Sequence, residues 1–263
     1  MRKHFLLIFV ALVLPFVTDA RADEYAWRGG WGAFESAFRV QCRFVTLQDK
    51  KQLDFDLGTA FGHKTGNVLS ANHVVEECIK KEGTLRLLSA DGSDSPATVV
   101  SHDAALDLVL LKPNDGFVKN PIPIRTNDTF AMGSQVSSWG FPNGYTDKAP
   151  LLTVSYLAGV SPDPSDAQIK RWVVNAAINI GNSGGPLLET VTPSVIGVVI
   201  LKYNPLTPEV GSQLKKLSEN GGAETSVLAQ AMIDIAKRSQ LVVGQAVMIS
   251  DLRAFLRQAG VEP

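Results

Sequence analysis

The 263-residue sequence predicts an all-β protein made of two barrels or sandwiches, and three observations support this fold class. Short apolar stretches separated by turn signals recur along most of the chain, a spacing typical of such folds. A proline-rich link at 113–123 divides them into two groups. Helical composition is confined to the C-terminal quarter. With 45% hydrophobic and 19% charged residues, the chain has the composition of a globular protein.

The expected elements follow from this pattern in chain order. Strands are predicted at 38–47, 58–62, 68–71, 84–88, 97–101 and 106–111 before the link, and at 135–139, 151–160, 172–177, 186–188 and 195–201 after it. Two helices are expected near the C-terminus, at 226–238 with Ser226 as N-cap and at 251–258 with Ser250 as N-cap. A long polar insertion at 202–241 surrounds the first helix, and long insertions in compact domains tend to be functional or disordered.

Residues 1–22 have the features of a cleaved secretory signal peptide. Two basic residues precede an apolar run at 5–17, and Ala20-Arg21-Ala22 has the form of a signal-peptidase site. Because the run is short for a membrane span, an uncleaved anchor is the weaker alternative, and no span is expected after cleavage. Removing this segment leaves 22 basic and 25 acidic residues, a formal net charge of −3. A mildly acidic chain without a basic cluster does not support nucleic-acid binding.

The cysteine content is consistent with export. Cys42 and Cys78 are the only cysteines, and an oxidising compartment favours pairing them. The bond would close a loop of about 37 residues, worth roughly 3–4 kcal/mol in the chain-entropy model. Two free buried cysteines are the alternative.

The stretch Asn175–Leu188, N-A-A-I-N-I-G-N-S-G-G-P-L-L, is the first candidate for chemistry. Glycines flank Ser183, and glycine allows backbone conformations and close ligand approaches that are closed to other residues. The N–H groups of such a turn can converge on one point, as an oxyanion hole requires. Taken alone, the motif also fits a glycine-rich hairpin turn that carries a hydroxyl.

Three histidines lie outside the predicted signal peptide. His63 falls in an expected hairpin turn at 63–67, where an exposed side chain is predicted, and His102 at a strand end suits a surface role. His73 follows the apolar strand at 68–71 and precedes a segment with the pattern of one helical turn. Because a rigid strand end is a good place to fix a general base, His73 is the candidate for that role.

Asp107 is the candidate carboxylate. It lies among apolar residues in the stretch 104–111, and burying it is costly unless a group such as a histidine N–H holds its charge. An outward-facing strand position is the alternative. In α/β-hydrolases the triad histidine follows the serine, whereas no histidine follows Ser183. The order His73, Asp107, Ser183 is that of chymotrypsin-type enzymes.

With these motifs the sequence resembles the trypsin-like serine peptidases of the bacterial HtrA/Deg type. The blocks G-T-A-F-G, V-L-S-A-N-H-V-V, D-A-A-L-D-L-V-L-L-K and A-A-I-N-I-G-N-S-G-G-P-L occur in that family's order. A fifth block, G-Q-A-V-M-I-S-D-L-R-A-F-L, resembles the strand and helix that close the family's protease domain. The resemblance covers roughly residues 38–203 and 242–258.

The resemblance implies an all-β chymotrypsin-like fold of two six-stranded antiparallel barrels, with a C-terminal helix and a partly helical insertion. The mature domain would span 23–263, with the first barrel at about 38–112, the second at about 124–258 and the insertion at about 202–241. The implied function is an exported serine endopeptidase, in a bacterial periplasm or extracellular, that cleaves proteins or peptides without a metal or organic cofactor. A latent protease-fold protein acting as a binding or chaperone-like module is the competing class.

Roles for individual residues follow from the same resemblance. Ser183 would be the nucleophile and His73 the general base and then acid, with Asp107 orienting its ring. The N–H groups of Gly181 and Ser183 would form the oxyanion hole, where one donor is worth on the order of 3–4 kcal/mol of barrier.

Ala177 and Asn179 would line the substrate pocket. Because Ala177 stands where trypsin-like enzymes place their specificity charge, a small or medium apolar P1 residue is expected rather than Arg or Lys. Asn182 stands where digestive zymogens carry an aspartate that pairs with a new N-terminal ammonium. Activation by that ion pair is not expected, so the enzyme would be constitutively competent or switched by loop order.

Two departures from the family change what is expected of assembly and regulation. A PDZ domain is not expected after the closing helix, and a large cage assembly is therefore not expected either. The insertion at 202–241 replaces a short connection that lies beside the specificity pocket in this fold. It is either a lid or regulatory element over the cleft or a surface decoration.

Overall fold

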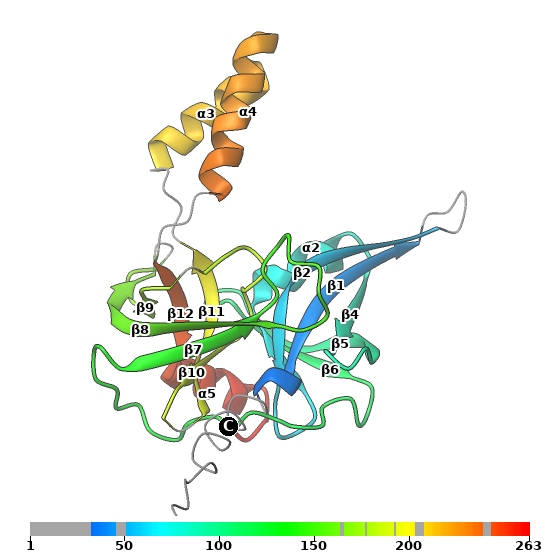
Figure 1. The fold of residues 1–263 in the computed structure, drawn as a ribbon, viewed down its shortest axis with the longest axis vertical. Coiled ribbons are helices and arrows are strands. Elements are labelled where there is room, and N and C mark those ends of the chain that lie inside the picture. The colour runs from blue at the N-terminus through cyan, green and yellow to red at the C-terminus, as the bar shows by residue number, and fades with distance from the viewer. Residues whose placement is uncertain are drawn as a thin grey trace, which may run out of the picture.

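The computed structural model describes residues 33–45, 51–163, 166–176, 178–191, 193–202, 208–238 and 243–263. Within these residues the strands form two closed, six-stranded antiparallel barrels that lie side by side (Figure 1). The predicted fold class is therefore confirmed. The predicted signal peptide lies outside the described residues.

The first barrel has the strand order β1-β2-β3-β6-β5-β4. On β1, Phe38, Val40 and Cys42 are buried in the core, as expected because alternate side chains of a strand face the same side. The short helix α2 connects β3 to β4. The elements are β1 (Ala37–Val45), β2 (Gln52–Gly62), β3 (Val68–Ser70), α2 (Asn72–Lys80), β4 (Thr84–Leu88), β5 (Asp94–Asp103) and β6 (Leu108–Pro113).

The second barrel has the strand order β10-β11-β12-β9-β8-β7. Helix α5 follows its last strand, and Leu252 and Phe255 of α5 join a cluster of buried side chains that also contains Phe38 of the first barrel and Val198 of β11. The two barrels therefore share a core. The elements are β7 (Gln135–Gly140), β8 (Leu151–Pro162), β9 (Lys170–Val174), β10 (Pro186–Glu189), β11 (Ser194–Lys202), β12 (Gly244–Met248) and α5 (Ile249–Gln258).

The insertion between β11 and β12 contains two helices, α3 (Pro208–Asn220) and α4 (Ala223–Arg238). They lie against each other and extend outward from the second barrel (Figure 1). Helix α3 was not predicted from the sequence, because its composition is largely polar. No helix in the described part of the chain is both long and apolar enough to cross a membrane.

Both predicted N-caps are wrong. Ser226 lies inside α4, where its hydroxyl donates to the carbonyl oxygen of Gly221 at 3.0 Å. Helix α5 begins at Ile249, and its N-cap residue Met248 makes no side-chain capping bond. Packing of the apolar face of α5 on the core extends this helix beyond Ser250, since tertiary contacts outweigh a local capping preference.

Candidate active site

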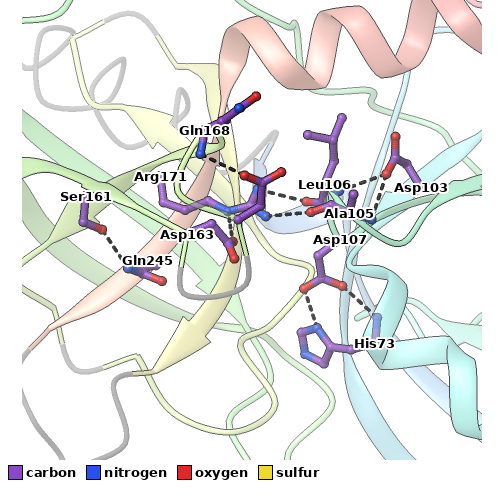
Figure 2. A network of polar contacts seen from close by, with 11 residues as sticks. His73, Asp103, Ala105, Leu106, Asp107, Ser161, Asp163, Gln168, Arg171 and Gln245 are labelled. Atoms are coloured by element: carbon purple, nitrogen blue, oxygen red, sulfur yellow. Dashed lines mark hydrogen bonds and ion pairs between the residues drawn. The ribbon is translucent and has the colours of Figure 1, made fainter.

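His73 and Asp107 form the hydrogen-bonded pair at the centre of the site. His73 is the second residue of α2, and its ring Nδ1 lies 2.7 Å from Asp107 Oδ2. The backbone N–H of His73 donates to the other carboxylate oxygen, Oδ1, at 2.9 Å (Figure 2). Both oxygens of Asp107 are bound by His73, one by the ring and one by the backbone N–H. The carboxylate therefore fixes the imidazole relative to the helix that carries it.

The strand predicted at 106–111 begins only at Leu108 in the structure, so Asp107 lies immediately before β6. Its φ is +59°, in the left-handed region that is uncommon for non-glycine residues but more accessible to aspartate than to most. Its carbonyl oxygen accepts the N–H of Asn72 at 3.2 Å. The outward-facing strand alternative is therefore wrong, because the backbone turns the carboxylate toward His73.

Ser183 lies in a tight turn before β10 in which the backbone N–H groups divide into two sets. The N–H groups of Asn182, Gly184 and Gly185 donate to carbonyl oxygens at 3.0, 2.6 and 3.0 Å. Those of Gly181 and Ser183 donate to no backbone carbonyl among the described residues. Two donors of the turn are thus left for another acceptor.

Only glycine fits at two positions of this turn. Gly181 has a φ of +98°, and a Cβ there would lie 2.3 Å from the carbonyl oxygen of Phe141. Gly184 has a φ of +85°, and a Cβ there would lie 2.1 Å from the carbonyl oxygen of Thr59. Gly181 and Gly184 are therefore required for two reasons, their backbone conformation and the close packing around them. The sequence motif alone does not show which of these reasons applies.

The hydroxyl of Ser183 donates to the carbonyl oxygen of Ile200 on β11 at 3.2 Å. His73 and Ser183, both described, share no hydrogen bond. The side chain thus rests away from the imidazole. Catalytic hydrogen bonds often form only in the complex with substrate, so this arrangement is compatible with a role for Ser183 in catalysis.

A buried threonine that the sequence analysis did not single out connects the first barrel to this turn. Thr59 of β2 donates its hydroxyl to Gly181 O at 2.6 Å and accepts the N–H of Phe141 at 3.0 Å. Its own N–H donates to Ser183 O at 2.9 Å. The only sequence signal was its place in the G-T-A-F-G block, which says nothing about these partners.

The predicted disulfide is present. Cys42 of β1 and Cys78 of α2 are bonded, with their Cα atoms 5.6 Å apart. The bond joins the wall of the first barrel to the helix that carries His73. It therefore stabilises the element that positions the imidazole.

The remaining candidates have mixed outcomes. Ala177 lies outside the described residues. Asn179 is half-buried, and its carbonyl oxygen accepts the N–H of Asn182 at 3.0 Å. His102 is exposed as predicted. No group of three or more His, Cys, Asp and Glu side chains suited to a metal ion occurs in the described part of the chain.

The prediction that His63 is exposed is wrong, because its side chain is buried in the turn between β2 and β3. Its ring Nδ1 lies 2.9 Å from Thr65 Oγ1. Burial, assisted by the nearby charge of Lys64, lowers the pKa of His63 to about 4. This histidine is therefore a neutral part of the packed structure.

The fold and this site define a class of protein. Residues 58–198, more than half of the chain, match the trypsin-like peptidase domain. The chain belongs to the trypsin-like peptidase family.

The relatives it resembles within the family are HtrA- and Do-like serine proteases. It is 31% identical to Protease Do-like 1, chloroplastic, of Arabidopsis thaliana over 54% of this chain and 32% of that protein. It is 29% identical to Serine protease Do-like HtrA of Bacillus subtilis over 56% of this chain and 33% of that protein. The chain thus matches about a third of the length of these relatives.

A solved structure supports the fold. The HtrA-type protease AlgW with decapeptide superposes with a TM-score of 0.66, covering 89% of this chain and 67% of that one. The sequence identity is 16%, so this likeness concerns the fold alone.

Proposed function

We propose that the protein is an exported serine endopeptidase that cleaves peptide bonds with Ser183, His73 and Asp107. The observation that carries the proposal is the contact of His73 Nδ1 with Asp107 Oδ2 at 2.7 Å in a trypsin-like peptidase fold. A carboxylate held in this way orients the imidazole and stabilises the imidazolium that forms during acyl transfer.

The chemistry proceeds in two stages. Ser183 Oγ leaves Ile200 O, transfers its proton to His73 Nε2 and attacks the carbonyl carbon of the scissile bond. The C–N bond then breaks, and the leaving amine takes the proton from His73, which leaves an acyl-enzyme. Water attacks the ester with His73 as base. The carboxylic acid departs, and the proton returns to Ser183 Oγ.

The N–H groups of Gly181 and Ser183, which donate to no backbone carbonyl in the described part of the chain, supply the oxyanion hole. In each tetrahedral intermediate the carbonyl oxygen becomes negatively charged, and two preorganised donors stabilise that charge without reorganisation. The neighbouring N–H groups are already committed to carbonyl oxygens. The N–H groups of Gly181 and Ser183 are the two donors of the turn that remain for a substrate oxygen, which supports this role.

The substrates we propose are proteins or peptides, with a small or medium apolar residue at P1. The relatives are named as proteases, and the AlgW structure contains a decapeptide. Profiling cleavage of a peptide library, with Ser183→Ala as the inactive control, tests both the substrate class and the P1 preference. Apolar P1 residues should dominate among the products, and a dominance of Arg or Lys at P1 would contradict the pocket assignment.

We propose export to a periplasm or the extracellular space, based on the signal-type N-terminus and the disulfide, which needs an oxidising compartment. Fractionation of cells and N-terminal sequencing test this part. The expected mature chain begins at Asp23 outside the cytoplasm. Cytoplasmic protein that starts at Met1 and has two free thiols would contradict it.

A second candidate function is a latent protease fold that binds peptides without turnover. The bond from Ser183 Oγ to Ile200 O favours it, because the nucleophile is held away from its base. Binding of an unfolded polypeptide without cleavage, equal in wild type and Ser183→Ala, would support this alternative over the first.

A further inference from the structure

We propose that Arg171 is a positioning residue for the active site, because its buried guanidinium fixes the backbone that leads into Asp107. The inference rests on the proposed role of Asp107 in the triad. Arg171 lies on β9 in the second barrel, whereas Asp107 belongs to the first. The contact therefore runs from one barrel to the other.

The guanidinium of Arg171 donates hydrogen bonds to the carbonyl oxygens of two consecutive residues. Arg171 Nη1 donates to Leu106 O at 3.0 Å and Nη2 to Ala105 O at 3.1 Å (Figure 2). Its Nε donates to Asp163 Oδ2 at 2.6 Å, just beyond the end of β8. The residue is 1% exposed, so these bonds are shielded from water.

The other side of the same segment is held by Asp103. Its Oδ1 accepts the N–H of Ala105 and of Leu106, both at 2.9 Å. The N–H groups of this segment are thus bound from the first barrel and its carbonyl oxygens from the second. The next residue, Asp107, is held in the left-handed region at a φ of +59°. Such a conformation persists only where the surroundings over-determine it.

This role explains why an arginine is buried here. A buried charge is expensive unless it is paired and its remaining donors are satisfied. Arg171 meets that condition with one carboxylate and two carbonyl groups. The planar fork of an arginine can bind two adjacent acceptors at once, whereas a lysine offers a single point charge. The arginine therefore sets the direction of the peptide groups as well as their distance.

The direct test measures how fast a fluorophosphonate probe labels Ser183. Arg171→Met should lower the second-order labelling rate by about 10- to 100-fold, because small displacements of catalytic groups have effects of this size. Arg171→Lys should recover part of the rate. Arg253→Met is the matched control, because Arg253 donates to Arg125 O and Thr126 O and pairs with Asp128, and among the described residues it makes no hydrogen bond to the segment before Asp107. Its labelling rate should equal that of the wild type.

Two further variants separate positioning from the ion pair itself. Arg171→Met removes the guanidinium that pairs with Asp163 and can impair folding, so the double variant Arg171→Met/Asp163→Asn removes both charges together. The double variant should fold, and the probe should label it as slowly as it labels folded Arg171→Met. In Asp163→Asn alone, the guanidinium of Arg171 still donates to both carbonyl oxygens, so this variant should be labelled at close to the wild-type rate.

A spectroscopic readout follows the His73–Asp107 pair without requiring activity. The low-field proton resonance of the hydrogen bond at His73 Nδ1 should disappear or broaden in the folded Arg171→Met and double variants and persist in Arg253→Met. If the wild type fails to label, the proposed function fails, and this resonance still decides the inference. An unchanged resonance in the folded double variant would overturn it, as would unchanged labelling in that variant when the wild type labels.

Discussion

The hydroxyl of Thr59 donates to the carbonyl oxygen of Gly181 at 2.6 Å, across the boundary between the two barrels. Thr59 is completely buried, and the same hydroxyl accepts the N–H of Phe141. The Ile180 carbonyl oxygen, on the other side of Gly181, accepts the N–H of Asn143 at 2.6 Å. The peptide groups on both sides of Gly181 are therefore fixed. Because N–H and C=O point in opposite directions across a planar peptide, the bond to Ile180 O also directs the Gly181 N–H, and the bond from Thr59 fixes the next peptide group.

Thr59→Val should slow Ser183 labelling by about tenfold or more, since it keeps the shape of the side chain but leaves two buried backbone groups unpaired. Thr59→Ser retains the hydroxyl and serves as the control, with a rate near that of the wild type. Labelling by the probe and a thermal melt separate loss of activity from loss of folding. Equal rates for the valine and serine variants, both folded, would refute this role for Thr59.

Gly181→Ala should reduce the labelling rate by about 10²- to 10³-fold, the usual effect of losing one oxyanion-hole donor. The added Cβ would lie 2.3 Å from Phe141 O, so the turn must move. Gly133→Ala is the control, because Gly133 also has a positive φ, of +84°, but a Cβ there meets nothing within 4 Å. A rate for Gly181→Ala equal to that of Gly133→Ala would contradict the assignment.

The sequence predicted most strand positions, because apolar stretches between turn residues mark the barrel walls. It also singled out His73 and Asp107, which lie in contact in the structure, because their motifs can be recognised from chain order alone. The joint catalytic role of these two residues and Ser183 stays a prediction. It failed where tertiary contacts decide the outcome. His63 reads as an exposed turn residue but is buried by packing. Arg171, just before the strand predicted at 172–177, reads as an ordinary charged residue, although two of its hydrogen-bond acceptors lie 65 and 66 positions away.

Replacing His63 should flatten the pH dependence of stability on the acidic side of neutrality. The unfolded chain binds a proton at this histidine below a pH of about 6.5, whereas the folded protein resists protonation down to a pH of about 4. As the pH is lowered from about 6.5 to about 4, the unfolded state therefore binds this proton before the folded state does. The free energy of unfolding falls by up to ~1.4 kcal/mol for each pH unit of this decrease.

Urea unfolding between pH 4 and pH 7 measures this effect. His63→Asn carries no group that titrates in this range and should lose this part of the slope. His102→Asn changes an exposed histidine and is the control, with the wild-type slope expected. A His63→Asn variant that keeps the full wild-type slope would contradict the burial of a neutral imidazole.

Breaking the disulfide should lower the free energy of unfolding by roughly 3–4 kcal/mol, the value that the chain-entropy model gives for a loop of this size. The bond spans 36 positions and holds α2, which carries His73, to β1. Urea melts with and without a reductant give the difference. The double variant Cys42→Ala/Cys78→Ala should be insensitive to the reductant. A wild-type protein whose stability is unchanged by reduction would show that the cysteines are unpaired.

Labelling of the purified mature protein with a fluorophosphonate probe shows whether Ser183 is an activated nucleophile, as the proposed function requires. We expect labelling of the wild type at Ser183, with loss of fluoride from the probe, and none in Ser183→Ala. Circular dichroism should confirm that both proteins are folded. A folded wild-type protein that the probe does not label would contradict the account and leave the peptide-binding alternative in its place.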